Sequence, residues 1–427
     1  MKMVKNLLTT CFAMVISTVA WADVEIVKEN FPDENFRNWV LSQGFGADGV
    51  LTTKEITGIR VIDVSSKNIR SLEGVEFFTA LTTLCCQQNQ LSALDVTKNT
   101  ALTTLCCHQN QLAALDVTKN VALTHLECSS NNLTALDVSK NTRLMTLKCQ
   151  LNQLTSLNVS GRTTLQILWC FGNQLKTLDV SDCTGLTGLD CYQNKLATLD
   201  LSGCTALEMV QCYQNELKTL NVSDCTALKE LRCYQNQLAA LNVSGCTALQ
   251  KLSCFDNQLT TLDASKNTAL TNLDCYQNKL ATLNLSGCTA LEKVHCYQNE
   301  LTTLDVSDCT ALKELRCYQN QLASLDVSGC TALQKLSCLG NRITTLDVSK
   351  NTALTELECS SNQLASLNVS QNTKLETLKC QWNELTILNV SNCAALQELR
   401  CNHNQLTALG VTGCTSLSHL ECSGNQL

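Results

Sequence analysis

The chain has 427 residues, among them 29 cysteines and a single proline, and only 4% of its residues are aromatic. Few ordinary domains combine so much cysteine with so little proline, so the composition indicates a periodic architecture. The formal net charge at pH 7 is −7. An acidic chain is repelled by phosphate backbones, which excludes nucleic acid as a favoured partner.

Residues 1–22 are typical of a secretory signal peptide. Lys2 and Lys5 make the start positive, residues 7–20 are mostly apolar, and Ala20 and Ala22 suit a cleavage site. Cleavage near Ala22 leaves 29 basic against 38 acidic side chains, a net charge near −9. No later segment is apolar enough to span a bilayer, so we expect a secreted, periplasmic or cell-surface protein.

Residues 23–58 are predicted to form a small helical cap. Phe36, Trp39 and Val40 fall on one face of a helix that would end at Gly44.

The stretch from Gly44 to Glu55 partly matches a calcium-binding EF-hand loop. Asp48, Gly49 and Glu55 fall on its fifth, sixth and twelfth positions, but the first and third positions are Gly44 and Gly46, which carry no side-chain oxygen. A degenerate structural remnant is therefore favoured over a working calcium site.

From residue 81 onward a period of 21 residues dominates the sequence. Asparagine recurs at this step from Asn89 to Asn425, seventeen times, and a cysteine always stands three positions before it. One unit runs Leu102-x-x-Leu105-x-Cys107-x-x-Asn110-x-Leu112, and a similar second half, Leu112-x-x-Leu115-x-Val117, follows. The alternation in each half predicts a short strand with two inward apolar side chains and one outward residue.

Residues 81–427 resemble the bacterial leucine-rich repeats of the nested 21-residue type. Residues 59–80 are similar to the 22-residue repeat of internalin-like proteins, with Lys67 where the asparagine should stand. The resemblance implies a β-rich solenoid of about 17 coils with short parallel strands. At a strand spacing of about 4.8 Å, such a rod or arc would be roughly 80 Å long.

Two features concern the repeats as an array. Residues 174–257 and 258–341 are near-copies of four units each, and such a duplication extends a surface rather than building one reaction centre. The sequence stops within a repeat at Leu427, so we expect Leu417 and Leu420 to be exposed and the end to fray or self-associate.

Export favours disulfides, but the in-register stacking of the repeated cysteines makes their Cβ vectors parallel, which fits the disulfide torsion poorly. We therefore expect buried free thiols. Nine further cysteines replace the asparagine of the second half, namely Cys183, Cys204, Cys225, Cys246, Cys288, Cys309, Cys330, Cys393 and Cys414. A metal site is not expected, because Cys-x-x-Cys pairs are absent and the histidines do not cluster.

Cys85 and Cys106 differ from the other cysteines because they take the outward strand position on successive coils. They are the best candidates for a disulfide, with His108 nearby as an alternative metal partner, although two unpaired thiols fit equally well.

A ladder of acidic and amide side chains occupies the outward position of the second half. Stacked carboxylates repel one another unless water or a cation screens them, and we favour hydration over cation binding. The ladder begins with Asp95, Asp116, Asp137, Asn158, Asp179, Asp200, Asn221, Asn242 and Asp263.

Aromatic residues give the most specific candidate site. One stands two positions before the asparagine in eight consecutive coils, where the side chain would point to solvent. An exposed stripe suits protein or glycan binding, whereas stacking of the rings along the rod is the alternative. The candidate ligand-binding residues are Trp169, Phe171, Tyr192, Tyr213, Tyr234, Phe255, Tyr276, Tyr297 and Tyr318.

These features favour a recognition protein or adhesin that binds a protein or glycan through exposed solenoid faces. A structural envelope or spacer protein without a specific ligand is the alternative. An enzyme is disfavoured because the cysteines lie mostly in apolar core, and no cofactor is expected.

Overall fold

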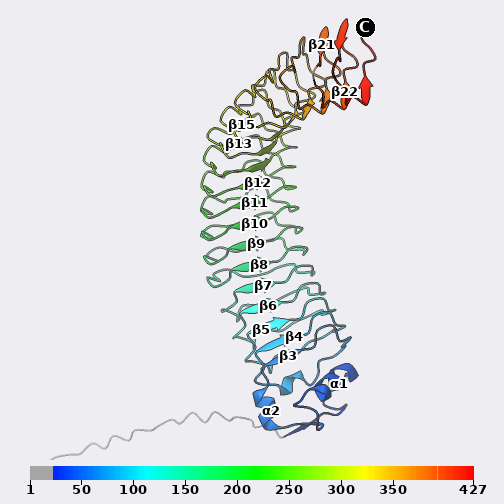
Figure 1. Ribbon diagram of the computed structural model, residues 1–427. Helices are drawn as coiled ribbons and strands as arrows, with labels where there is room; N and C mark the ends of the chain where they lie inside the picture. The colour runs from blue at the N-terminus through cyan, green and yellow to red at the C-terminus, as the bar shows by residue number, and fades with distance from the viewer. Residues whose placement is uncertain (1–22, 392) are drawn as a thin grey trace, which may run out of the picture.

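The computed structural model describes residues 23–391 and 393–427, so the expected signal peptide lies outside the described residues. The coils stack on one another into a curved rod with little helix (Figure 1). This architecture confirms the predicted leucine-rich-repeat solenoid.

The segment that precedes the coils contains two helices and a small antiparallel sheet. Helix α1 spans Glu34–Ser42 and α2 spans Thr53–Gly58, and strand β1 (Val24–Glu25) pairs with β2 (Val50–Leu51). The carboxylate of Asp33 caps α1 through the Phe36 amide, and its second oxygen accepts from the Arg70 amide at 2.7 Å. Asn35 also donates to the Asn68 carbonyl at 3.0 Å, so two side chains join the helical segment to the first coil.

Aromatic rings close the N-terminal end of the core. Phe31, Phe36 and Phe78 are fully buried, and the Phe31 ring lies within 6.5 Å of both of the others, measured between ring centroids. Phe77 also contacts Phe31, and it ends the short 3₁₀ helix Val75–Phe77. The apolar end of the first coil is therefore covered rather than exposed to water.

The main sheet is parallel and in register along the rod. Successive strands are offset by 21 residues, except that β3 and β4 are offset by 22. The sheet is open, with β3 at one edge and β24 at the other. Its strands are β3 (Val61–Asp63), β4 (Thr83–Cys85), β5 (Thr104–Cys106), β6 (His125–Glu127), β7 (Thr146–Lys148), β8 (Ile167–Trp169), β9 (Gly188–Asp190), β10 (Met209–Gln211), β11 (Glu230–Arg232), β12 (Lys251–Ser253), β14 (Asn272–Asp274), β16 (Lys293–His295), β17 (Glu314–Arg316), β18 (Lys335–Ser337), β19 (Glu356–Glu358), β20 (Thr377–Lys379), β22 (Glu398–Arg400) and β24 (His419–Glu421).

The second half of each coil is only partly regular. Strands β13 (Thr261–Asp263) and β15 (Thr282–Asn284) pair with each other, as do β21 (Ile387–Asn389) and β23 (Ala408–Gly410). Several other coils form single parallel bridges at the same position. The main sheet therefore provides the continuous backbone ladder of the rod.

The core follows from the alternation within each coil. In β9, for example, Leu189 and the following Cys191 are fully buried, while Gly188 and Asp190 face outward. The buried leucines and cysteines of the coils belong to one hydrophobic cluster, and each coil buries its apolar side chains only against its neighbours.

The repeated asparagine holds adjacent coils together through backbone groups. The amide nitrogen of Asn215 donates to the carbonyls of Cys191 and Cys212, both at 3.1 Å, and its oxygen accepts from the Leu196 amide at 3.0 Å. The same three bonds recur along the rod. These bonds pair backbone groups at the turn that the sheet cannot reach.

Most of the second-half cysteines keep at least one of the two side-chain hydrogen bonds that asparagine makes to the preceding coil. Asn141 donates from its side chain to the Val117 carbonyl at 3.0 Å, and the Cys183 thiol donates to the equivalent Val159 carbonyl at 3.2 Å. Asn141 also leaves its side-chain oxygen buried without a partner among the described residues. Cysteine keeps one of the two donated bonds and removes the unsatisfied acceptor, which favours its use at this position.

The repeated cysteines should be protonated and inaccessible in the folded protein. All the cysteines of the described residues are free thiols, and burial raises the pKa of the Cys204 thiol to about 11. A thiol-reactive reagent at pH 8 should therefore label at most Cys85, Cys106, Cys414 and Cys422, which are partly exposed. Unfolding in guanidinium without reductant should make the remaining cysteines reactive.

The variant Cys85→Ser with Cys106→Ser is the matched control, because it should remove part of the fast reaction and leave the slow one unchanged. Near-absence of reactive thiols after unfolding would show that the cysteines are bridged instead.

Candidate functional site

The candidate aromatic residues, apart from Trp169, form one continuous stack that we call the aromatic column. It consists of Phe171, Tyr192, Tyr213, Tyr234, Phe255, Tyr276, Tyr297 and Tyr318. Neighbouring ring centroids are 4.2–4.4 Å apart and the ring planes differ by 9–10°. The rings therefore cover one another's faces and present only their edges to solvent.

This stacking limits what the aromatic column can bind. Sugar rings contact aromatic faces, and the faces inside the column are occupied. The exposed edges carry the tyrosine hydroxyls, and burial raises the pKa of Tyr318 to about 12, so these groups remain protonated hydrogen-bond donors. The geometry supports the stacking expected as the alternative, while the column as a ligand-binding site remains a proposal.

Trp169 lies apart from the aromatic column. It ends strand β8, and its side chain lies beside Lys148, whose ammonium nitrogen is 4.6 Å from the ring centroid. It therefore belongs to the outward side of the main sheet, which we call the strand face and define as the first and third residue of each main-sheet strand.

The strand face also carries a network of ion pairs that sequence analysis did not identify. His295 Nδ1 lies 2.8 Å from Asp274 and its Nε2 lies 3.3 Å from Glu314, which also pairs with Arg316 at 2.7 Å. Lys148 pairs with Glu127 at 2.7 Å nearer the N-terminal end. Each partner comes from an adjacent strand or from the same strand, so the pairing depends on the 21-residue register.

Cys85 and Cys106 are brought together as their spacing predicts. They are register partners on β4 and β5, and each thiol is partly buried and free. Burial raises the pKa of Cys106 to about 12, which keeps the thiolate scarce and slows disulfide formation. His108 faces Glu127 at 3.7 Å instead. Across residues 23–391 and 393–427, no cluster of three or more His, Cys, Asp or Glu side chains could hold a metal ion.

The EF-hand-like stretch is arranged for local structure. Glu55 accepts hydrogen bonds from the amide and the hydroxyl of Thr52, at 2.9 and 2.7 Å, and so completes the capping box of α2. Asp48 accepts from the Val50 amide at 3.1 Å. Both carboxylates are used by the backbone, as a structural remnant would require.

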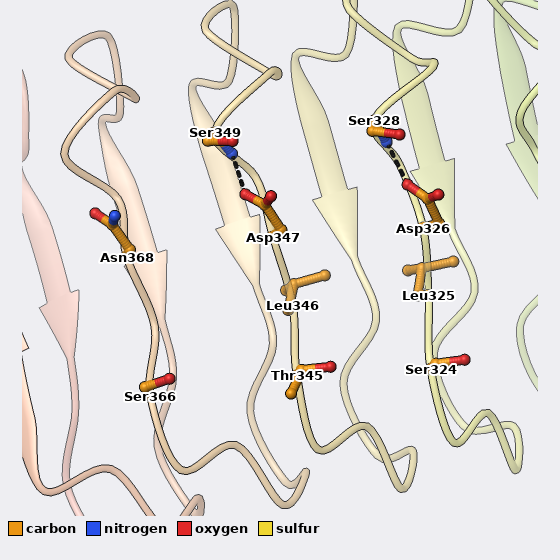
Figure 2. Close-up of a pocket in the computed structure, with 10 residues that line it drawn as sticks. All are labelled: Ser324, Leu325, Asp326, Ser328, Thr345, Leu346, Asp347, Ser349, Ser366 and Asn368. Carbon is orange, nitrogen blue, oxygen red and sulfur yellow. Dashed lines mark hydrogen bonds between the residues drawn. The ribbon is translucent and has the colours of Figure 1, made fainter.

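Three members of the acidic and amide ladder, Asp326, Asp347 and Asn368, line a hollow of about 730 Å³ in the second half of the coils (Figure 2). Each member accepts a hydrogen bond from the amide two residues later: Asp326 from Ser328 and Asp347 from Ser349, both at 2.8 Å. Asn368 makes the same bond with Ser370 at 3.0 Å. The ladder therefore stabilises turns, which explains why aspartate and asparagine interchange freely within it.

These bonds make the turns sensitive to acid. The backbone and hydroxyl hydrogen bonds of Ser328 and Ser349 lower the pKa of Asp326 and Asp347 below the ordinary aspartate value. Because the folded state favours the carboxylate, this contribution is present above about pH 4 and is lost as the pH falls through the lowered folded pKa. The melting temperature should therefore decrease when the pH is lowered below about 4.

The double substitution Asp326→Asn and Asp347→Asn should make the melting temperature less sensitive to acid, because asparagine keeps the bond without titrating. Thermal melts between pH 2.5 and 6 measure this effect, and an unchanged acid sensitivity would contradict the assignment.

The aromatic column should contribute to stability through ring contacts. Replacing Tyr213, Tyr234, Tyr276 and Tyr297 with serine leaves only the Phe171–Tyr192 contact, and each lost contact should cost about 0.5–1.5 kcal/mol. The melting temperature should fall. Phenylalanine at the same four positions is the control, because it keeps the stack and removes only the hydroxyls. Equal melting temperatures for the serine and phenylalanine variants would rule out a stabilising stack.

Within residues 23–391 and 393–427, no helix has both the length and the apolar character needed to cross a membrane.

The comparisons with solved structures agree on the fold. The functional domain of InlJ from Listeria monocytogenes, described as including a cysteine ladder, is 32% identical, with 91% of this chain and 77% of that one covered and a TM-score of 0.60. YopM from Yersinia enterocolitica is 24% identical, with 82% of this chain and 79% of YopM covered and a TM-score of 0.62. A leucine-rich-repeat protein of Leptospira interrogans is also 24% identical, with 82% of this chain and 92% of the Leptospira protein covered and a TM-score of 0.60. The latter two establish the fold alone. No protein-family model and no curated protein sequence matches the chain.

Proposed function

Because the chain belongs to the internalin-like leucine-rich-repeat proteins, we propose that it is a secreted or cell-surface recognition protein that binds a protein ligand through its strand face. In this proposal the signal peptide is removed near Ala22, and binding involves no catalytic step. The exposed edges of the aromatic column flank the strand face and form the margin of the same surface.

The observation that supports this proposal is the contrast between uniform turns and a varied strand face. The turn sequence Cys-Thr-Ala-Leu recurs in six of the seven coils from Cys204 to Cys330, and the seventh has Asn267 in place of the cysteine. In contrast, the first strand position from β7 to β12 carries a different residue in every coil: Thr146, Ile167, Gly188, Met209, Glu230 and Lys251. A spacer needs no such variety, whereas a surface that recognises one ligand does.

A structural spacer is the second candidate, and the aromatic column favours it. A continuous stack of eight rings stiffens the rod without requiring a ligand. This candidate predicts no specific partner for the strand face.

Binding to immobilised proteins and glycans distinguishes the two candidates. Residues 23–427 should bind a protein ligand. The double substitution Arg232→Ser and Arg316→Ser removes two arginine side chains from the strand face and should weaken that binding at least tenfold. Serine already stands at the same strand position in β12 and β18, so the fold should tolerate both changes. Asp305→Asn with Asp326→Asn is the control, since it changes charge in the second half of the coils and keeps the turn bonds. Absence of any protein ligand, or equal loss in the control, would favour the spacer.

Self-association through the last coil is a separate part of the proposal. Leu420 is 43% exposed, and Leu417 and Cys422 are only partly buried. Sedimentation of the same preparation reports the oligomeric state, and a monomer at all concentrations would exclude this part alone.

A further inference from the structure

A hollow of about 410 Å³ lies on the strand face between β8 and β12, the strands labelled near the middle of Figure 1. Its apolar wall consists of Ile167, Trp169 and Met209, and Gly188 lies between Ile167 and Met209 in the sheet. Met209 is 40% exposed, so this wall is uncovered in the free chain.

Gly188 creates the hollow by lacking a side chain. A Cβ atom built on it would meet nothing within 4 Å, so the backbone there does not require glycine for packing. The register places Ile167 and Met209 on the two strands that flank it. The missing side chain therefore leaves a gap about one side chain wide between two apolar neighbours.

The rim of the hollow carries one ammonium group outside the ion pairs of the strand face. Glu208 pairs with Lys229 at 2.8 Å, and Glu230 pairs with Arg232 at 2.5 Å. Lys251 has no ion-pair partner among the described residues. A carboxylate brought by a ligand would therefore find this ammonium group available.

The duplicated block provides an internal comparison. Between residues 174–257 and 258–341 the strand face differs at three places, where Gly188, Met209 and Gln211 correspond to Asn272, Lys293 and His295. Lys335, the counterpart of Lys251, pairs with Glu356 at 3.3 Å. The second block therefore carries polar side chains at the positions of Gly188 and Met209, and Glu356 of the following coil pairs with the counterpart of Lys251.

We propose that this hollow binds an apolar side chain of an extended segment of the protein ligand, with an acidic side chain of the same segment pairing with Lys251. This inference rests on the proposed function and specifies where and how the ligand is recognised. Gly188 and Lys251 are three strand spacings apart, or ~14 Å, which an extended chain crosses in about four residues. The ligand segment thus carries an aliphatic or aromatic residue about four positions from a carboxylate.

The segment runs along the rod rather than across it, because the hollow and Lys251 lie on different strands at the same strand position. A sugar is a poorer occupant, since the walls formed by Ile167 and Met209 offer no hydrogen-bonding groups, and Lys148 already lies against the Trp169 ring.

Synthetic peptides of ten residues are the probe. They carry Leu, Phe or Trp four positions from Asp, in both orders, and matched peptides have serine in place of the apolar residue. Residues 23–427 should bind the best patterned peptide at least tenfold more tightly than its serine match, measured by fluorescence anisotropy. The fluorescence of Trp169 should change with the same dissociation constant.

Gly188→Asn with Met209→Lys should weaken binding at least tenfold, and Lys251→Gln should weaken it and reduce its dependence on salt. Both substitutions of the first variant copy residues that the second block already carries at the same strand position, and thermal melts verify that the variant folds. Lys293→Met is the control. It alters the strand position that Met209 has in β10, but on β16 and outside the hollow, and should leave the affinity for the peptide unchanged.

Equal binding of patterned and serine peptides, or full affinity in the Gly188→Asn and Met209→Lys variant, would overturn the inference. Loss of glycan rather than peptide binding in that variant would also overturn it. If Arg232→Ser with Arg316→Ser abolishes binding to the protein ligand while the hollow variants retain it, the proposed function stands and this inference alone fails.

Discussion

The hydrogen bonds of the repeated asparagine are the constraint on which the rest of the molecule depends. Each side chain donates to two carbonyls, one on its own coil and one on the preceding coil, and accepts from an amide of the preceding coil. The side chain is nearly buried, so losing it would leave three backbone groups unpaired, at a cost of about 1–3 kcal/mol for each group. These bonds therefore hold each coil in a fixed position against the coil before it, and Asn89 makes them even across the 22-residue offset between β3 and β4.

The fixed position of each coil determines what the surface can do. Because successive coils repeat the same backbone, outward side chains at the same position form continuous columns that follow the rod. A column of like residues becomes a continuous stack, as from Phe171 to Tyr318, whereas a column of unlike residues becomes a surface with local chemistry. Rigidity and recognition thus reside in neighbouring columns of one scaffold, and each can change without altering the core.

The sequence predicted the period, the inward cysteines and the short strands, because these depend on spacing and on the polarity of single residues. It placed the aromatic residues in one column but left open whether their faces would be free, since that depends on how the side chains tilt.

The turn bonds of Asp326 and Asp347 were missed because a column of carboxylates was interpreted through repulsion alone. The hollow at Gly188 was missed because it is defined by an absent side chain and by walls that lie one coil away on each side. A glycine among large outward residues was the available signal.

The duplicated block shows how such a surface can diversify. Both copies keep the core and the turn bonds, so a substitution on the strand face changes the local chemistry with little effect on folding. One copy exposes Met209 beside Gly188, and the other places Lys293 and His295 at the matching positions, with His295 held between two carboxylates. The copies therefore present an apolar hollow and a charged cluster four coils apart on one rigid face. A ligand that contacts both must be extended along the rod, because no rearrangement of the coils can bring the two regions closer together.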